Sequence, residues 1–310
     1  MVGLGVSDLL FRNKNIDVWI ANGLAILLWA SAFAGIRAGL VSYTPLHLAF
    51  LRMFIGSTAL ALFVVFKRIR IPDLKDIPIF LLCGFCGFSV YHIALNIGET
   101  TVNAGLSSLI ISLAPVFTGI LSTLFLNERF TSRGWFGTLI CFTGVALISL
   151  GKEGSFYLTT GVFWILLAAF SESLYFVIQT PYLKKYGIIP FTTYTIWSGT
   201  LFMFFTVPKL LHEILSASRY TNLSVIYLGL FPTVIAYFAL AYAVSKVGSA
   251  KGSSSIYLTP VTAIMIAWIW LGEIPGWLSI IGGMIILAGV ILVNKGTIKK
   301  AKTRGEHTAQ

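Results

Sequence analysis

The sequence predicts an all-α polytopic membrane protein with ten transmembrane helices arranged as a 5+5 inverted-topology repeat. Two observations carry this prediction. Of the 310 residues, 57% are hydrophobic and only 11% are charged, whereas soluble domains carry about 25% charged residues. The chain also repeats itself at an offset of 145 residues, because Leu113-Ala114-Pro115-Val116 corresponds to Leu258-Thr259-Pro260-Val261. So few charged residues cannot cover the surface of a folded domain in water. We therefore expect the protein to be surrounded by the lipid bilayer.

The predicted spans follow from windows of about 20 residues with few or no charges, which is the length needed to cross the hydrocarbon core. They divide the chain into an N-terminal segment at 1–17, a first five-helix repeat at 18–151, a second at 158–294 and a basic tail at 295–310. The expected helices lie at about 18–39, 45–66, 77–98, 103–126, 134–151, 158–181, 190–211, 222–245, 250–271 and 277–294.

The distribution of Lys and Arg predicts the orientation, because positive residues concentrate in cytoplasmic loops. With the N-terminus inside, 17 of the 22 positive residues are cytoplasmic, so both termini are expected in the cytoplasm. Each half has an odd number of helices, and the second half is therefore inverted relative to the first. Glu128 then ends helix 4 on the cytoplasmic side, and its repeat partner Glu273 ends helix 9 on the outer side.

The repeat runs without a gap from Gly84 to Val145. Further upstream the same offset pairs Pro45 with Pro190, and it makes Trp197 the second copy of Arg52. A membrane chain built from two copies of one unit is typical of carriers, because alternating access needs two related halves that rock about a site between them.

The net charge of +11 does not predict a nucleic-acid partner, because the positive residues sit in short loops and the tail and form no basic face. The three cysteines lie inside apolar stretches, and Cys83-Gly84-Phe85-Cys86 has no flanking His or second pair. We therefore interpret this CxxC spacing as helix packing, and we expect neither a metal nor a cofactor.

The two copies of one motif resemble a known family. Pro115 precedes Leu126-Asn127-Glu128, Pro260 precedes Leu271-Gly272-Glu273, and helix 1 carries Trp29-Ala30-Ser31-Ala32-Phe33. This combination resembles the proline-to-LxE signature of the EamA branch of the drug/metabolite transporter superfamily. The resemblance covers residues 18–294. It implies ten helices, a central cavity and transport of small metabolites, most often export of amino acids or related compounds.

The resemblance implies a secondary transporter in the inner or plasma membrane, with export as the first expectation and uptake or exchange of another small organic solute as the alternative. Its expected partners are a small-molecule substrate, the lipid bilayer and, as a candidate, protons; the expected state is a monomer or weak dimer. The chain has no P-loop of its own. An enzyme is not predicted, since no cluster of nucleophile, base or metal ligands accompanies Glu172 and His92.

Glu172 is the most informative polar residue, because it falls near the centre of helix 6. An ionisable group there costs about 2.5–3.5 kcal/mol on insertion scales. Two interpretations stay open. The carboxyl is either hydrogen-bonded to a neighbouring helix, or it lies in a cavity where it carries a proton or contacts a substrate amine. Tyr175 follows at i+3 and extends the polar face.

Arg52 and His92 are the other ionisable candidates within spans. Arg52 lies seven residues into helix 2, and we favour a structural or hinge role over a counter-charge to a substrate carboxylate or to Glu99. His92 lies in helix 3 beside Tyr91, with Asn96 on the same face. A lone buried His is more often a hydrogen-bonded core residue than a proton relay.

Pro115 and Pro260 are expected to kink equivalent helices, because each lacks the N–H that closes an i to i−4 bond. The hydroxyl residues upstream of the second kink, Ser254 and Tyr257, are candidates for the cavity wall. Trp29, Tyr91, Tyr175 and Tyr237 are candidates for its aromatic part. The predicted substrate-binding residues are Trp29, Tyr91, His92, Asn96, Glu172, Tyr175, Tyr237, Ser254 and Tyr257, and the predicted structural or hinge residues are Arg52, Pro115, Pro260, Glu128 and Glu273.

Overall fold

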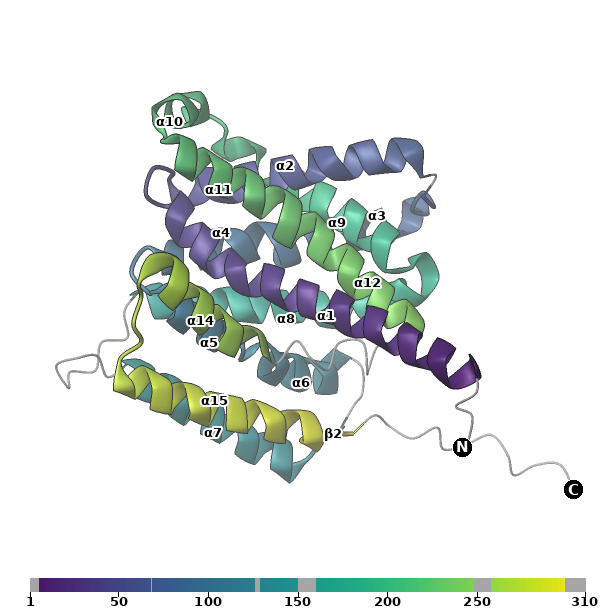
Figure 1. Cartoon of the computed structure of the whole chain (residues 1–310), viewed down its shortest axis with the longest axis vertical. Coiled ribbons are helices and arrows are strands. Elements are labelled where there is room, and N and C mark those ends of the chain that lie inside the picture. Colours follow the sequence, from purple (N-terminus) through teal and green to yellow (C-terminus); the bar gives the residue numbers. More distant parts are fainter. Residues whose placement is uncertain (1–5, 68, 126–128, 150–159, 248–257, 299–310) are drawn as a thin grey trace, which may run out of the picture.

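The computed structural model describes residues 6–67, 69–125, 129–149, 160–247 and 258–298, and almost all of them are helical (Figure 1). Up to the middle of the chain the elements are α1 Val6–Gly39, α2 Pro45–Phe66, η1 Leu74–Asp76, α3 Ile77–Gly84, η2 Phe85–Val90, α4 Tyr91–Glu99, α5 Ala104–Ile111, α6 Ala114–Phe125, β1 Arg129–Phe130 and α7 Ser132–Ser149. They continue with α8 Thr160–Tyr186, α9 Ile188–Phe202, η3 Phe204–Thr206, α10 Leu210–Ser216, α11 Arg219–Leu230, η4 Phe231–Ile235, α12 Ala236–Val247, α14 Thr259–Leu271, α15 Trp277–Gly296 and β2 Thr297–Ile298.

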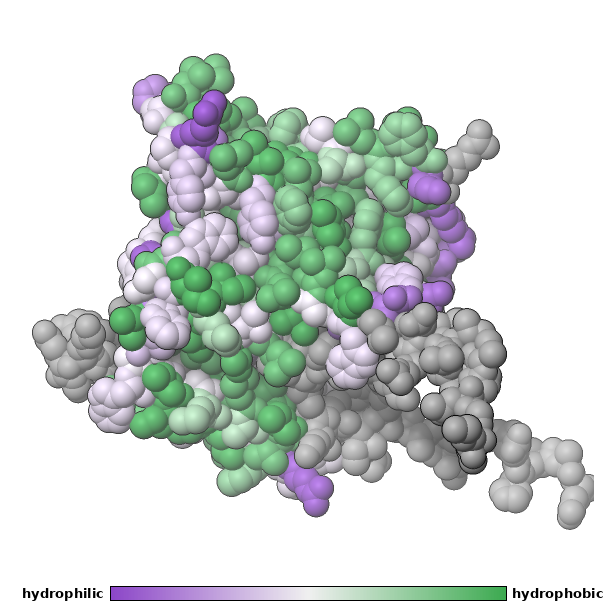
Figure 2. Space-filling view, viewed as in Figure 1, coloured by the Kyte–Doolittle hydropathy of each residue, from purple (hydrophilic) through white to green (hydrophobic). Residues whose placement is uncertain are grey.

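The helices have the length and composition of membrane spans. Within the described ranges, seven are long and apolar enough to cross a bilayer, and shorter apolar helices lie at Thr259–Leu271 and Trp277–Val293. Figure 2 shows hydrophobic residues over most of one face, with hydrophilic ones gathered beside α10 and beside the connection from α2 to α3. An apolar surface this large is unfavourable in water and favourable in lipid. The protein is therefore a multi-pass membrane protein.

The first expectation to be corrected concerns Pro115. We expected one kinked helix over 103–126, but α5 ends at Ile111 and α6 begins at Ala114. At the break, Leu113 N donates to Ile110 O and Val116 N donates to Leu113 O, which are tighter i to i−3 bonds. Pro115 thus occupies the second position of a new helix, where its missing N–H costs nothing. Pro260 takes the corresponding position in α14.

The predicted helix over 190–211 is too long at its C-terminal end. The structure ends α9 at Phe202, and η3 and the short α10 follow. Pro208 has no N–H to donate, and Lys209 has a φ of 69°, in the left-handed region. These two residues stop any continuation and start α10 in a new direction.

Both halves contain a π-helical turn at the same place in the repeat. The π-helix η2 covers Phe85–Val90 and η4 covers Phe231–Ile235, which coincide to within one residue at the offset of 145. A π turn inserts an extra residue and disturbs the hydrogen-bond ladder. Hydroxyls on the two turns bond carbonyls five residues upstream: Ser89 Oγ donates to Gly84 O at 3.5 Å, and Thr233 Oγ1 donates to Leu228 O at 2.8 Å.

The helices α7 and α15 lie side by side (Figure 1) and contact each other in a reciprocal pattern. A Cβ built on Gly137 would lie 2.8 Å from Gly289 O, and one built on Gly144 would lie 2.7 Å from Gly282 O. Each glycine therefore contacts the repeat partner of the other. Reciprocal contacts of this kind are the signature of a two-fold relation, and only glycine permits so close an approach.

The helices α2 and α9 show the same reciprocity, but at an offset of 143. Gly56 contacts Thr233 and Gly199 contacts Phe88, and these two partners are themselves 145 residues apart. The pairing of Pro45 with Pro190 is therefore wrong by two residues, and Arg52 corresponds to Thr195 rather than to Trp197. The second half simply holds two more residues between this helix and its π turn, in the connection that contains α10.

Candidate functional site

A cavity of about 230 Å³ lies between helices of both halves. Repeat-related residues occur together in its wall. They are Trp29 with Glu172 and Phe33 with Phe176 at the offset of 143, and Phe88 with Thr233, His92 with Tyr237, Leu95 with Leu240, Ala114 with Thr259 and Pro115 with Pro260 at the offset of 145.

Most of the predicted site residues that the structure describes line this cavity. They are Trp29, Tyr91, His92, Glu172 and Tyr237 among the predicted binding residues, and Arg52, Pro115 and Pro260 among the predicted hinge residues. The structure brings them together from α1, α2, α4, α6, α8, α12 and α14. Three further predicted residues, Glu128, Ser254 and Tyr257, lie outside the described part of the chain.

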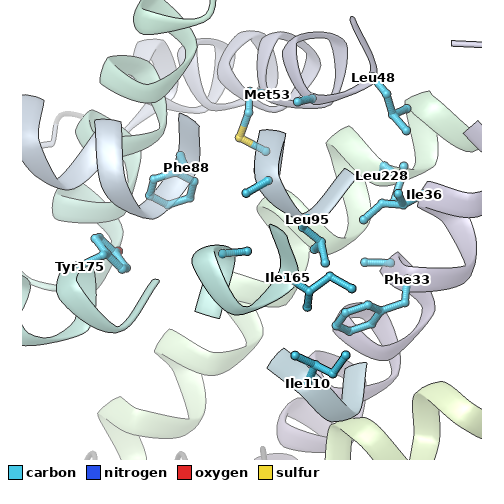
Figure 3. Packing of buried hydrophobic residues seen from close by; sticks show 14 of the residues in the cluster. Phe33, Ile36, Leu48, Met53, Phe88, Leu95, Ile110, Ile165, Tyr175 and Leu228 are labelled. Carbon is cyan, nitrogen blue, oxygen red and sulfur yellow. The ribbon is translucent and has the colours of Figure 1, made fainter. Parts of the chain in front are cut away.

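Two predicted binding residues do not line the cavity. Asn96 is buried and donates from Nδ2 to Pro45 O at 3.0 Å, so it ties α4 to the start of α2. Tyr175 is also buried, and Figure 3 shows it beside Phe88, with ring centroids 5.5 Å apart. Its ring lies directly over Gly87, where a Cβ would meet it at 2.5 Å. Both side chains therefore pack between elements.

Arg52 is held in the cavity wall by the other half of the protein. Its Nε donates to Oγ1 of Thr233 on the π turn at 3.0 Å, and that hydroxyl in turn donates to Leu228 O of α11. The side chain is 5% exposed, and the terminal guanidinium nitrogens make no hydrogen bond to any described residue. The guanidinium is therefore fixed in place with donors left over for a ligand. Sequence reasoning missed Thr233, and its hydroxyl beside Pro232 is the signal that could have found it.

Glu172 projects from the middle of α8 into the same cavity. Its carboxyl makes no hydrogen bond to a described residue, and it shares the cavity wall with Tyr91 and Tyr237. A carboxyl without a partner in a mostly apolar cavity wall is costly to ionise. Glu172 is thus available to a cationic ligand or to a proton.

The aromatic side of the cavity is built around Trp29. Its Nε1 donates to Pro232 O at 3.1 Å, and its ring meets Tyr237 edge-on with centroids 5.3 Å apart. On α4, His92 packs against Tyr91 at 4.8 Å, and its Nδ1 is buried with no hydrogen-bond partner among the described residues. Apart from these groups the wall is mostly aliphatic and aromatic.

Glu273, the second-copy glutamate of the repeated motif, lies away from the cavity at one end of the bundle. Gly272 has a φ of 70°, and Glu273 N donates to Ala267 O while Gly272 N donates to Trp268 O. The left-handed Gly272 with its i to i−4 bond is an αL cap, which ends many helices. It sets Glu273 just past α14, where Oε1 accepts from Arg37 Nε at 3.2 Å and Oε2 accepts from Ala104 N at 2.9 Å.

The comparisons with known proteins agree with this architecture. The profile of the EamA-like transporter family matches residues 18–150 and again 159–295. An uncharacterized transporter of Bacillus subtilis, YdfC, is 53% identical over 90% of this chain and 91% of its own length. A probable terminal-alkyne amino-acid exporter of Streptantibioticus cattleyicolor is 36% identical over 93% of this chain and 97% of its own length.

One solved crystal structure, 18% identical, covers 90% of this chain and 96% of its own with a TM-score of 0.59, a likeness of fold alone. The family profile accounts for nearly all the described helices, and both relatives cover most of the chain. The chain therefore belongs to the EamA-like transporter family of the drug/metabolite transporter superfamily, whose members are transporters and not enzymes.

Proposed function

We propose that this protein is a secondary active transporter that exports a small amino acid or a related compound by alternating access. The observation that carries the proposal is the charge pattern of the cavity. Among the described lining residues, Arg52 is the one cationic side chain and Glu172 the one acidic side chain. A ligand with one carboxylate and one ammonium group complements this pair, because each charged end finds an opposite charge.

The apolar wall suits the rest of such a ligand. Phe33, Leu95 and Phe176 line the cavity together with the aromatic group around Trp29. A site that is mostly apolar with a few fixed polar groups is the usual form of a small-molecule site. The α-amino and carboxylate groups would set the orientation, and an apolar side chain would fill the remaining volume.

The proposed architecture is ten transmembrane helices in two inverted five-helix repeats, at 18–151 and 158–294, flanked by segments 1–17 and 295–310. The reciprocal glycine contacts and the repeat-related pairs in the cavity wall support it. Two equivalent halves give two equivalent ways to close the cavity, one toward each side of the membrane.

The proposed setting is the cell membrane, with both termini in the cytoplasm and the protein acting as a monomer or weak dimer. The prevalence of positive residues in loops expected inside supports this orientation. Export is favoured over uptake because the relative from Streptantibioticus cattleyicolor is named as a probable amino-acid exporter. Protons are the proposed coupling ion, since Glu172 offers a titratable group inside the cavity.

The test uses three related ligands on purified protein. Leucine carries both charges, 4-methylpentanoate lacks the ammonium group, and isopentylamine lacks the carboxylate. We expect leucine to raise the thermal midpoint most, and both analogues to bind at least about tenfold more weakly, because each leaves one charge of the cavity wall without a partner. Liposomes loaded with the best ligand should then show counterflow, which neither a channel nor an enzyme gives.

Two variants test which cavity residue recognises which charged group of the ligand. Glu172→Gln should abolish the preference for leucine over 4-methylpentanoate, and Arg52→Gln should abolish the preference over isopentylamine. Glu213→Gln is the matched control, because this carboxyl lies in α10 and outside the cavity. If no amino acid shifts the midpoint and no counterflow appears with any zwitterion, the proposal is wrong.

A further inference from the structure

The buried carboxyl of Glu99 has no part in the proposed transport site. Glu99 is the last residue of α4, and it is fully buried. Neither of its carboxyl oxygens has a hydrogen-bond partner among the described residues. Its main-chain carbonyl, in contrast, accepts a hydrogen bond from Arg37 Nη1 at 2.6 Å.

The same arginine takes part in a contact that joins two helices. Arg37 lies in the last turn of α1 and pairs with Glu273 at 3.2 Å. The other oxygen of Glu273 accepts from Ala104 N, the first residue of α5. Glu273 thereby fastens the end of α1 to the start of α5, beside the end of α4.

The charged groups that act on Glu99 come from three elements. They are Arg37 of α1, Glu273 after α14 and Arg52 of α2, and Tyr91 lies at the start of α4. The helix α5 carries no titratable side chain, and neither does the stretch of α8 that packs against Gly98, at Gly161 and Ile165. Arg37 is thus the cation already attached to the main chain of Glu99.

An ionised carboxylate in this position lacks any hydrogen bond, which is a costly state for a buried charge. The neutral, protonated carboxyl is therefore the form that suits the observed arrangement. On losing its proton Glu99 needs a cation, and Arg37 can supply one by turning from Glu273. Arg37 cannot pair equally well with both carboxylates, so an ion pair with Glu99 weakens the contact between α1 and Glu273.

We propose that Glu99 is a proton-binding site that controls the Arg37–Glu273 contact. With the proton bound, Arg37 stays on Glu273 and this end of the bundle is closed. When the proton leaves to water, Arg37 moves to the Glu99 carboxylate, Glu273 releases α1 and this end opens. The consequence for transport rests on the proposed alternating access, but the proton site itself does not require any substrate.

The test measures access to the cavity from this end. Ser108 lies one turn into α5 and lines the cavity, so Ser108→Cys reports opening with little change in size. The three native cysteines are buried. Labelling by an impermeant thiol reagent is measured across pH and divided by the rate at Ser216→Cys, an exposed position on α10, which corrects for the pH dependence of the reagent.

The normalised rate should rise with pH, by up to about tenfold per unit, as one proton is released. In Glu99→Gln it should stay low at every pH, because the amide resembles the protonated carboxyl. In Glu273→Gln it should stay high at every pH. Glu213→Gln is the matched control, because this carboxyl already has partners in His47 and Thr44, and it should keep the rise.

A rise with pH that survives in Glu99→Gln overturns the proposal, and so does a low rate in Glu273→Gln. If Glu99→Gln fails to give a monodisperse protein, Arg37→Met decides the question. This variant has no guanidinium that could move between Glu273 and Glu99, so access should be high and independent of pH. A persistent pH-dependent rise in Arg37→Met then refutes the site. Failure of amino acids to bind would leave these labelling results unchanged, so the two proposals fail separately.

Discussion

The Sγ atom of Cys141 lies 3.6 Å from the carbonyl oxygen of Ile286, and these two residues are 145 positions apart. A residue that contacts its own repeat partner lies on the axis that relates the two repeats. Ser57 and Thr200 form a second such pair at an offset of 143, with hydroxyl oxygens 2.7 Å apart. One contact joins α7 to α15 and the other joins α2 to α9, and both have the form that a two-fold relation between the repeats requires.

The first prediction concerns the glycines that surround Cys141. Gly144→Ala should destabilise the protein by about 1–3 kcal/mol, because the new Cβ would lie 2.7 Å from the backbone oxygen of Gly282. Gly23→Ala in α1 is the matched control, since nothing lies within 4 Å of its Cβ, and alanine favours a helix. Thermal midpoints in one detergent compare the two, and an equal midpoint for both variants would contradict the close packing.

The second prediction concerns the left-handed residue before Glu273. Gly272→Ala should cost about 1–2 kcal/mol, because a φ of 70° places Cβ against the following carbonyl. Gly272→Asn should cost less, since asparagine tolerates this conformation. No atom lies within 4 Å of a Cβ at this position, so the loss reports backbone strain alone. A midpoint for Gly272→Asn at or below that of Gly272→Ala would argue against this explanation.

The helices and the main cavity residues could be predicted from sequence because the membrane makes polarity expensive. An apolar stretch identifies a span, and Glu172 within one needs a reason to be there. The rotation of a helix about its own axis could not be predicted in the same way. Tyr175 and Phe176 are neighbours in α8, yet Phe176 lines the cavity and Tyr175 packs against Phe88.

The π turns explain a second feature that could not be predicted from the sequence, which is the orientation of the side chains that follow them. Each inserts a residue, which rotates everything downstream on that helix by about 100° relative to a regular α-helix. His92 and Asn96 both follow η2 and both carry this rotation, which a regular helical period does not predict. The break before Pro115 was not predicted for a related reason. A proline in the sequence indicates that a backbone hydrogen bond is lost, but it does not indicate whether the helix bends or ends and begins again.

The third prediction tests the proposed orientation. Ser216→Cys on α10 and Lys75→Cys between α2 and α3 are both exposed positions that we expect on opposite sides of the membrane. In intact cells, an impermeant thiol reagent should label the first and spare the second until the cells are permeabilised. The reverse pattern would invert the topology, and labelling of both in intact cells would exclude this arrangement of spans.

The fourth prediction concerns acid stability at the end of the bundle opposite α10. Lys185 Nζ lies 2.5 Å from Asp73 Oδ2, and this hydrogen bond lowers the pKa of Asp73. A lowered folded pKa means that the contribution is present above the unfolded pKa of about 3.9 and is lost as pH falls through the folded pKa. Asp73→Asn should therefore lower the thermal midpoint at neutral pH and leave a shallower decline in acid.

A double-mutant cycle with Lys185→Met provides the control for this ion pair. Removing Asp73 should matter less once Lys185 is absent, because the two groups act through one contact. Full additivity of the two losses at neutral pH would show that the pair does not stabilise the protein. We expect the coupling to shrink in high salt, since Asp73 is 39% exposed and its charge is screened.

The last prediction separates the two roles proposed for Glu172. The ionised carboxylate attracts a substrate ammonium group, but the protonated one does not, so a proton and the substrate compete for it. Leucine binding to the wild-type protein should weaken as pH falls, and it should be weaker and independent of pH in Glu172→Gln, which keeps the shape and hydrogen bonding but cannot titrate. Binding is measured by calorimetry on detergent-purified protein across pH. Net flux in liposomes should lose the part of its pH dependence that comes from Glu172 in the same variant, while the part that comes from opening at Glu99 remains. Exchange of substrate for substrate should persist in part, because exchange requires no proton transfer. A Glu172→Gln protein that binds and transports with the wild-type pH profile would make this carboxyl a structural group, and the coupling would then have to lie at another residue.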